Sequence, residues 1–232
     1  MPVSQFGAPT GPGGWLAAHL VARLTAEANR WMIDCLDVGP DDRVLDVGCG
    51  PGVGVAYAAA AGARRVVGVD ASPVMVRHAR RRNRSAVRRG QVEIRQADAM
   101  RLPFPNGAFT KAGSLNSLQF WASAEAGLAE LRRSLEPGGR VAVVLMARSD
   151  EPAAGPVPWV EETVAALRAA GFAGVKVESR SFAGVLHRAL LGYGGGKGSG
   201  APLDPTADGV RKGAGLQYHV RRTACRIEDE EP

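Results

Sequence analysis

A glycine-rich turn after an apolar segment is the first feature of this chain that could do chemistry. Residues 46–54 read DVGCGPGVG. The glycines Gly48, Gly50 and Gly52 let the backbone turn sharply and approach a ligand without a Cβ atom in the way. The dinucleotide-binding pattern G-x-G-x-x-G requires a glycine at position 53, and this chain has Val53 there. The turn is therefore predicted to bind a ligand other than a nicotinamide dinucleotide.

Two acidic residues flank this turn in the sequence. Asp46 precedes the first glycine, where a carboxylate would repel a pyrophosphate but attract a ligand with an ammonium and a sulfonium group. Asp70 ends a second apolar segment at about the 20-residue spacing at which an acid meets a ribose diol in doubly wound folds. As an alternative, Asp70 could cap the helix predicted after Ser72. The two acids favour a ligand that combines a ribose with positive charge.

The elements that must position these residues alternate between strand and helix. Hydrophobic patterns predict strands at 43–47, 65–69, 92–95, 110–114, 140–145 and 175–179. Helices are predicted within 15–36, at 55–61, from Ser72-Pro73 through the arginines, at 124–135 and at 157–170. This alternation indicates parallel strands joined by right-handed crossovers, so we expect an α/β, doubly wound fold. In such sheets ligands bind outside the carboxyl ends of the strands, where the glycine-rich turn would lie.

The alternation does not extend over the whole chain. We expect a flexible leader at 1–14, one domain at 15–182 with a helical cap at 15–38, and an irregular extension at 183–232. Within this extension, residues 216–223 could form a strand at the sheet edge. The leader lacks the basic and apolar regions of a signal peptide, and no apolar run approaches the roughly 18 residues of a membrane span. A cytoplasmic protein without a membrane partner is expected.

Cysteine usage and charge narrow the functional classes further. Cys35, Cys49 and Cys225 are widely spaced and odd in number, which fits neither a disulfide framework nor a zinc site, and we predict no metal. The net charge of +6 lies in residues 77–90, which hold seven arginines and no acid. Such a run can bind nucleic acid, but on a helix with an apolar inner face it can equally be a solvated surface. We expect the solvated surface, and no nucleic-acid partner.

Four ordered motifs resemble those of the class I S-adenosylmethionine-dependent methyltransferases. The pattern D-x-G-x-G-x-G at 46–52 resembles motif I, and VVGVDASPVMVRHAR at 66–80 resembles the second motif. The segment RQADAMRLPFPNGAFTKA at 95–112 is similar to the acid-plus-LPF segment of the family. The last motif is SLNSLQFW at 114–121 with LRRSLEPGGRVAVV at 131–144, which look like the end of the fourth strand and the entry to the fifth. The resemblance covers about residues 29–179 and is closest to small-molecule, type 11/25-like bacterial members. It implies a mostly parallel, seven-stranded-type, Rossmann-like sheet whose last strands stay uncertain in this chain.

The resemblance also implies roles for individual residues. Asp70 would bind both ribose hydroxyls, Ala71 and Met75 would flank the adenine, and Asp98 with the Ala99 amide would contact the adenine edge. The other predicted contacts to the cofactor S-adenosyl-L-methionine are in the turn, at Asp46, Gly48, Cys49, Gly50 and Gly52. Polar contacts to the methionine moiety or the substrate are expected from Asn29, Ser114, Asn116 and Gln119, and an aromatic acceptor wall from Trp31, Phe120, Trp121 and Trp159.

The resemblance implies methyl transfer to a small-molecule acceptor by in-line displacement, in a monomer or homodimer. A general base is required only if the acceptor must lose a proton, and none of His19, His78, His187 and His219 can be assigned that role. One alternative is an RNA or other nucleic-acid methyltransferase that uses the basic helix at Arg77–Arg89. Another is a non-catalytic cofactor-binding module. A nicotinamide-dependent reductase is disfavoured by Val53 and by the lack of a Tyr-x-x-x-Lys pair.

Overall fold

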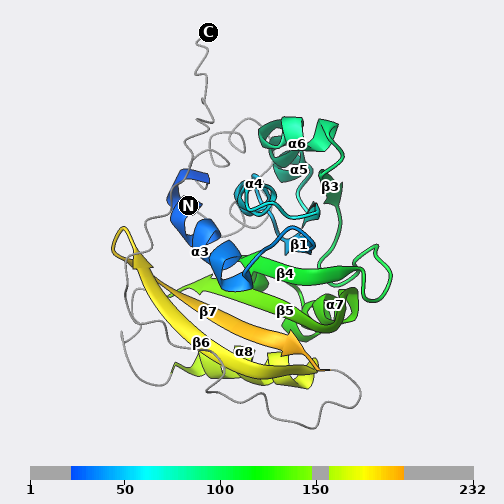
Figure 1. Cartoon of the computed structure of the whole chain (residues 1–232). Helices are drawn as coiled ribbons and strands as arrows, with labels where there is room; N and C mark the ends of the chain where they lie inside the picture. Colours follow the sequence, from blue (N-terminus) through cyan, green and yellow to red (C-terminus); the bar gives the residue numbers. More distant parts are fainter. Residues whose placement is uncertain (1–21, 148–156, 196–232) are drawn as a thin grey trace, which may run out of the picture. The chain divides into compact units, whose positions relative to one another are not determined.

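One seven-stranded sheet organises the chain in the computed structural model, which describes residues 22–147 and 157–195 (Figure 1). The strand order is β3-β2-β1-β4-β5-β7-β6; the first five strands in this order are parallel, and β7 runs antiparallel to both β5 and β6. The strands are β1 (Arg43–Val47), β2 (Arg65–Asp70), β3 (Val92–Gln96), β4 (Phe109–Leu115), β5 (Leu135–Met146), β6 (Phe172–Phe182) and β7 (Val185–Gly194).

Helices cover both faces of this sheet (Figure 1). One face packs against α3 (Ala26–Leu36), α4 (Val53–Ala60), α5 (Pro73–Arg82) and α6 (Arg84–Arg88). The other packs against α7 (Ala124–Ser134) and α8 (Pro158–Ala169), and a short 3-10 helix, η1 (Leu118–Phe120), follows β4. This is the doubly wound α/β arrangement that the alternation of elements predicted.

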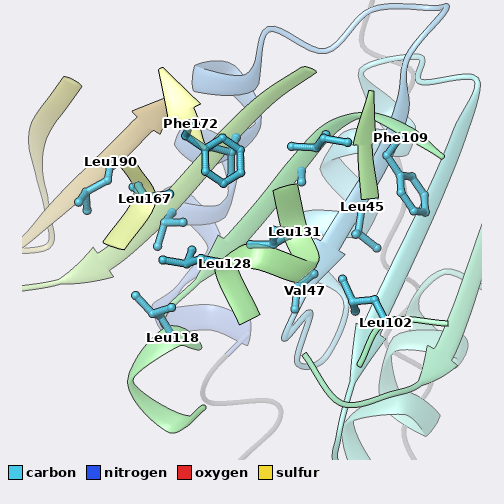
Figure 2. Packing of buried hydrophobic residues seen from close by; sticks show 14 of the residues in the cluster. Leu45, Val47, Leu102, Phe109, Leu118, Leu128, Leu131, Leu167, Phe172 and Leu190 are labelled. Atoms are coloured by element: carbon cyan, nitrogen blue, oxygen red, sulfur yellow. The ribbon is translucent and has the colours of Figure 1, made fainter. Parts of the chain in front are cut away.

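Strand periodicity explains why two separate cores form. Successive side chains of a strand point to opposite faces, so Val44 of β1 joins the core under α3 while Leu45 joins the core under α7. Figure 2 shows the core under α7 and α8, with Leu128 and Leu131 of α7 among residues from several strands. The heptad-like spacing of Leu128, Leu131 and Leu135 predicted this buried face, and all three side chains are at most 2% exposed.

Local sequence signals set where the helices near the ligand edge begin. Ser72 caps α5, where its Oγ accepts a hydrogen bond of 3.4 Å from the Met75 amide and Pro73 occupies the first turn. Ser123 caps α7 in the same way, at 3.1 Å from the Ala126 amide. The helix predicted to run through the arginines is divided at Asn83 into α5 and α6.

The end of the domain differs from the prediction. Residues 183–232 were expected to be irregular, which is wrong for 185–194, because β7 lies there between β5 and β6. His187 and Arg188 interrupt the apolar pattern of this strand, yet both are buried. The predicted strand at 216–223 and the leader at 1–14 lie outside the described residues. Within the described ranges, no helix is long and apolar enough to cross a membrane.

Because β7 is an inner strand, its apolar side chains should contribute strongly to stability. Leu190 is fully buried and lies opposite Val143 and Val177 of the neighbouring strands. We expect Leu190→Ala to lower the free energy of unfolding by about 2–5 kcal/mol, the range for truncating a buried leucine. The matched control Val185→Ala, at a position 39% exposed, should change it by less than about 1 kcal/mol. Urea unfolding measures both, and equal effects would contradict the inner position of β7.

Candidate functional site

A cavity of about 350 Å³ lies at the carboxyl ends of β1, β2, β3 and β4. Parallel strands joined by crossovers place the turns that follow them at one edge of the sheet, which brings segments distant in sequence together. Ten of the twelve predicted cofactor-binding residues line this cavity. They are Asn29, Asp46, Gly48, Cys49, Gly50, Asp70, Ala71, Met75, Asp98 and Ala99.

The glycine-rich turn needs its glycines for conformation and for space. Gly48, Gly50 and Gly52 all have positive φ angles, of 71°, 52° and 79°. The amides of Gly48 and Cys49 both donate to the carbonyl oxygen of Val69 at the end of β2, at 2.8 and 2.9 Å. At Gly48 a Cβ atom would lie 1.9 Å from Oγ of Ser117, so the turn packs directly against the segment after β4.

Asp70 is fixed by two backbone amides. Its Oδ2 accepts a hydrogen bond from the Gly50 amide and its Oδ1 accepts one from the Ser72 amide, each at 2.8 Å. Burial raises the pKa of Asp70, while the two amide hydrogen bonds act in the opposite direction. The carboxylate thus joins the glycine-rich turn to the start of α5, and a carboxylate oxygen can accept more than one hydrogen bond.

Asp46 is the most electrostatically unusual residue of the site. Its side chain is 2% exposed, and its Oδ2 has no hydrogen-bond partner in the described part of the chain. Burial, followed by the charge of Asp70, raises the pKa of Asp46 to about 7, against a smaller opposing effect of the Val55 amide. A buried carboxylate oxygen without a hydrogen-bond partner is costly, so a donor or a cation near Oδ2 would lower that cost.

Asn29 of α3 places a second acceptor oxygen near Gly54, as Asp46 does. Its Nδ2 donates to the carbonyl oxygen and the Oγ1 of Thr25, at 2.9 and 3.1 Å, which fixes the orientation of the amide. A Cβ atom on Gly54 would lie 2.8 Å from Asn29 Oδ1 and 2.6 Å from Asp46 Oδ2. Two acceptor oxygens from different elements therefore converge at the start of α4.

The segment after β3 forms a more open, largely apolar wall. Asp98 is exposed, and its Oδ1 accepts a hydrogen bond of 2.9 Å from the Met100 amide. This is the turn-forming arrangement that a lone aspartate after a strand favours. Ala97 and Ala99 line the cavity on either side of Asp98 in the sequence, and Ala71 and Met75 line it as well.

The segment after β4 closes the other end of the cavity. Asn116 has a φ angle of 49°, and its Oδ1 accepts a hydrogen bond of 2.7 Å from the Met146 amide at the end of β5. Trp121 donates from Nε1 to Ser117 Oγ at 2.9 Å. Asn116, Phe120 and Trp121 line the cavity as the sequence suggested, whereas Gln119, Trp31 and Trp159 are absent from its described wall.

Two predicted site residues point elsewhere. Ser114 pairs with Val143 and follows Gly113, which lies opposite Asp46, so its side chain faces the α7 side of the sheet. Gly52 is the N-cap of α4, and a Cβ atom there would meet Asn83 and Ala79 of α5. Neither residue lines the described cavity: the side chain of Ser114 faces the other side of the sheet, and Gly52 packs against α5.

Sequence reasoning missed Thr25, Met100 and Ser117 as lining residues. Thr25 had a weak signal, since it stands four residues before Asn29 at helical spacing. Ser117 had none, because its contact with Gly48 joins segments that are distant in sequence.

No histidine in the described part of the chain reaches the cavity. His187 is buried on β7, where its ring contacts Phe182 and its Nδ1 lies 3.1 Å from the Val185 carbonyl oxygen. Burial lowers the pKa of His187. His78 is half-buried on α5, and His19 and His219 lie outside the described residues. The described residues also contain no cluster of three or more His, Cys, Asp or Glu side chains that could hold a metal ion.

Comparison with known proteins adds a family match and curated relatives. The family described as "Methyltransferase domain" matches residues 44–139. An uncharacterized 37.1 kDa transposon protein of Streptomyces fradiae is 40% identical over 112 residues, 47% of this chain and 32% of that protein. The uncharacterized methyltransferase YdaC of Bacillus subtilis is 26% identical over 172 residues, 72% of this chain and 91% of that protein. The chain spans only about half the length of several other curated relatives.

Solved structures share the fold. Geranyl diphosphate C-methyltransferase from Streptomyces coelicolor, solved in complex with Mg²⁺, geranyl diphosphate and S-adenosyl-L-homocysteine, superposes with a TM-score of 0.59 at 19% sequence identity. The match covers 83% of this chain and 88% of that one. At this identity the similarity establishes the architecture of the sheet and its helices.

Two of the glycines of the turn, Gly48 and Gly50, make a matched pair for substitution. Gly50→Ala should lower the free energy of unfolding by about 1–2 kcal/mol, because the backbone is left-handed there but a Cβ atom would meet nothing within 4 Å. Gly48→Ala should cost clearly more, because its Cβ atom also collides with Ser117. Urea unfolding tests the difference, and the double variant Gly48→Ala/Ser117→Gly should restore most of it. Equal costs for both single variants would contradict this packing.

Asp46 should make stability depend on pH. Its pKa is raised from 3.8 to about 7 in the folded state, so the folded state binds more protons than the unfolded state between these values. Stability therefore falls as pH rises from about 4 to 7, by about 1.4 kcal/mol for each unit of pKa difference. Asp46→Asn should remove this loss, so its advantage in the free energy of unfolding over wild type should grow between pH 5 and pH 8. The control Asp41→Asn, at an exposed aspartate, should show no such growth.

Proposed function

Because the chain belongs to the class I S-adenosylmethionine-dependent methyltransferase superfamily, we propose that it binds S-adenosyl-L-methionine in the cavity and transfers the methyl group to a small-molecule acceptor. The observation that carries this proposal is the pair of carboxylates that meets at the glycine-rich turn. Asp46 offers an unpartnered oxygen, and Asp70 is held rigidly by the Gly50 and Ser72 amides. A ligand with an ammonium group and a ribose would offer hydrogen-bond donors to both carboxylates, the ammonium group to Asp46 and the ribose hydroxyls to Asp70.

The methionine end of the cofactor fits the space between α3 and the turn. Asp46 Oδ2 and Asn29 Oδ1 converge there, and an ammonium group supplies the donors that both oxygens need. A cation at this point favours the ionised form of Asp46, so binding should bring its raised pKa down. A bound ammonium group would thereby compensate the buried Asp46 Oδ2, which has no hydrogen-bond partner in the described part of the chain.

The nucleoside end fits the segments after β2 and β3. The carboxylate of Asp70 retains acceptor capacity toward a ribose diol, since each of its oxygens accepts one amide hydrogen bond from the chain. Met75 and Ala71 offer apolar contact to the faces of an adenine, together with Ala99. Asp98, exposed beside them, offers an acceptor for the exocyclic amine.

When bound, the cofactor would supply an electrophilic methyl group on a sulfonium for in-line transfer to the acceptor. The protein's task is to align the acceptor behind that methyl group and to exclude water. Asn116, Phe120 and Trp121 stand at the end of the cavity that follows β4, where they can hold an acceptor. We assign no general base, and an acceptor that needs no deprotonation is compatible with this wall.

A small-molecule acceptor is supported by the nature of this wall. Phe120 and Trp121 give apolar contact area, and Asn116 and Ser117 add polar groups beside them. The relative solved with geranyl diphosphate acts on a small molecule on the same fold. In contrast, the basic helix that motivated a nucleic-acid substrate contributes no arginine to the described cavity wall.

The proposal predicts that Asp70→Ala abolishes binding of S-adenosyl-L-methionine, because the variant loses the ribose acceptor and also releases the Gly50 amide. Isothermal titration calorimetry should show binding by the wild-type protein and at least a hundredfold weaker binding, on the order of 3 kcal/mol or more, by the variant. The control Asp41→Ala, an exposed carboxylate that precedes β1, should bind like the wild type. Absence of binding by the wild type would refute the proposal.

Turnover separates an enzyme from a non-catalytic binding module. Wild-type protein incubated with labelled S-adenosyl-L-methionine and the small-molecule fraction of a cell extract should release S-adenosyl-L-homocysteine. The Asp70→Ala protein should release none above background. Cofactor binding without turnover on any small-molecule or RNA fraction would favour the binding module, and turnover with RNA alone would favour a nucleic-acid methyltransferase.

A further inference from the structure

The carboxyl end of the arginine-rich helix α5 contacts the glycine-rich turn. Asn83, the residue that follows α5, is 5% exposed, and its Nδ2 donates to the Gly52 carbonyl oxygen at 3.0 Å and to the Ala79 carbonyl oxygen at 2.9 Å. Arg82 donates from Nε to the Pro51 carbonyl oxygen at 3.0 Å. Two consecutive carbonyl groups of the turn are thus held by two consecutive side chains.

Packing at Gly52 shows how close this contact is. A Cβ atom at Gly52 would lie 2.6 Å from Asn83 Nδ2 and 2.9 Å from both Cα and Cβ of Ala79. No side chain fits between the turn and α5, so the backbone of the turn rests on the helix itself. The positive φ of Gly52 is the conformation that lets α4 begin immediately after this contact.

The residues just before α5 also bind the turn. Asp70, just before α5, accepts the Gly50 amide, while Arg82 and Asn83, at the end of α5, bind the next two carbonyl groups. Residues at the two ends of α5 therefore hold one amide and two carbonyl groups of the turn proposed to contact the cofactor. The hydrogen bond from Arg82 is charge-assisted and stronger than a neutral one.

The other arginines of the run do not share this position. Arg80 donates from Nε and Nη2 to the Ile94 carbonyl oxygen, at 3.2 and 2.9 Å, and so ties α5 to β3. Arg81 is exposed on the same helix, and the described part of the chain shows no hydrogen bond from its side chain. The expected solvated face is therefore interrupted at Arg80 and Arg82, which are bound to the fold.

We propose that Arg82 and Asn83 are positioning residues that clamp the Pro51 and Gly52 carbonyl groups and so hold the glycine-rich turn in the conformation that binds the cofactor. The clamp itself is a property of the ligand-free chain, whereas its effect on affinity rests on the proposed function. Neither side chain lines the cavity, so both act through the backbone of the turn.

Amide hydrogen exchange in the ligand-free protein tests the clamp directly. In Arg82→Ala, the amides of Gly48, Gly50 and Gly52 should exchange about three- to tenfold faster than in wild type, the factor expected for losing one hydrogen bond. Asn83→Ala should show a larger effect at the same amides. The matched control Arg81→Ala removes an arginine from the same helix and should leave these rates unchanged.

Calorimetry with S-adenosyl-L-homocysteine tests the effect on affinity. Arg82→Ala should weaken binding by about threefold or more, Arg82→Lys should recover part of the loss because it keeps a donor, and Arg81→Ala should match wild type. A general loss of stability would instead accelerate exchange throughout the sheet, which the β5 amides report. Unchanged exchange in the turn for both Arg82→Ala and Asn83→Ala would overturn the clamp.

Hydrogen exchange and calorimetry distinguish a failure of the clamp from a failure of the proposed function. If the wild type does not bind S-adenosyl-L-homocysteine, the proposed function is wrong, and the exchange rates still decide whether the two side chains hold the turn. If the wild type binds S-adenosyl-L-homocysteine, but Arg82→Ala and Asn83→Ala bind it as tightly as the wild type, the positioning role is wrong and the proposed function stands.

Discussion

The carboxylate of Asp70 is the interaction on which the rest of the site depends. It accepts the Gly50 amide from the turn after β1 and the Ser72 amide at the start of α5, so it joins the two connections that form the floor of the cavity. Without it, the partly buried Gly50 amide of this left-handed turn would have to find another acceptor. The parallel pairing of β1 and β2 makes this bond possible, because it ends both strands at the same edge.

The site is stabilised less well than the sheet that carries it. Asp46 is buried beside Asp70 with one oxygen unpartnered, an arrangement that raises its pKa and costs folding free energy increasingly from about pH 4 to about pH 7. Cores on both faces of the sheet, with fully buried residues such as Leu45, Leu131 and Leu190, can sustain that cost. Local strain of this kind persists where the surrounding structure determines it and where a ligand relieves it.

The sequence predicted those parts of the site that follow from local patterns. Gly48, Gly50 and Asp70 could be placed because a strand followed by glycines and a strand followed by an acid are local signals with a fixed position in a doubly wound sheet. Ser114 could not be placed, because a change of one residue in register reverses the face of a strand. The strand β7 was missed because buried polar residues at 187 and 188 break its pattern, although the sheet provides partners for its backbone.

The two ends of the cavity are built by different means, and this explains why the cofactor can be inferred and the acceptor atom cannot. The cofactor end uses backbone amides, glycine conformations and the carboxylates of Asp46 and Asp70, which a short motif encodes almost completely. The acceptor end uses side chains of one connection after β4, held by the left-handed Asn116 and its bond to the Met146 amide. Trp121 also donates to Ser117 Oγ, and Ser117 packs against Gly48, so an exchange of Trp121 would reach the glycine-rich turn, whereas Phe120 is 41% exposed. On the proposed function, acceptor specificity would therefore depend on this segment after β4.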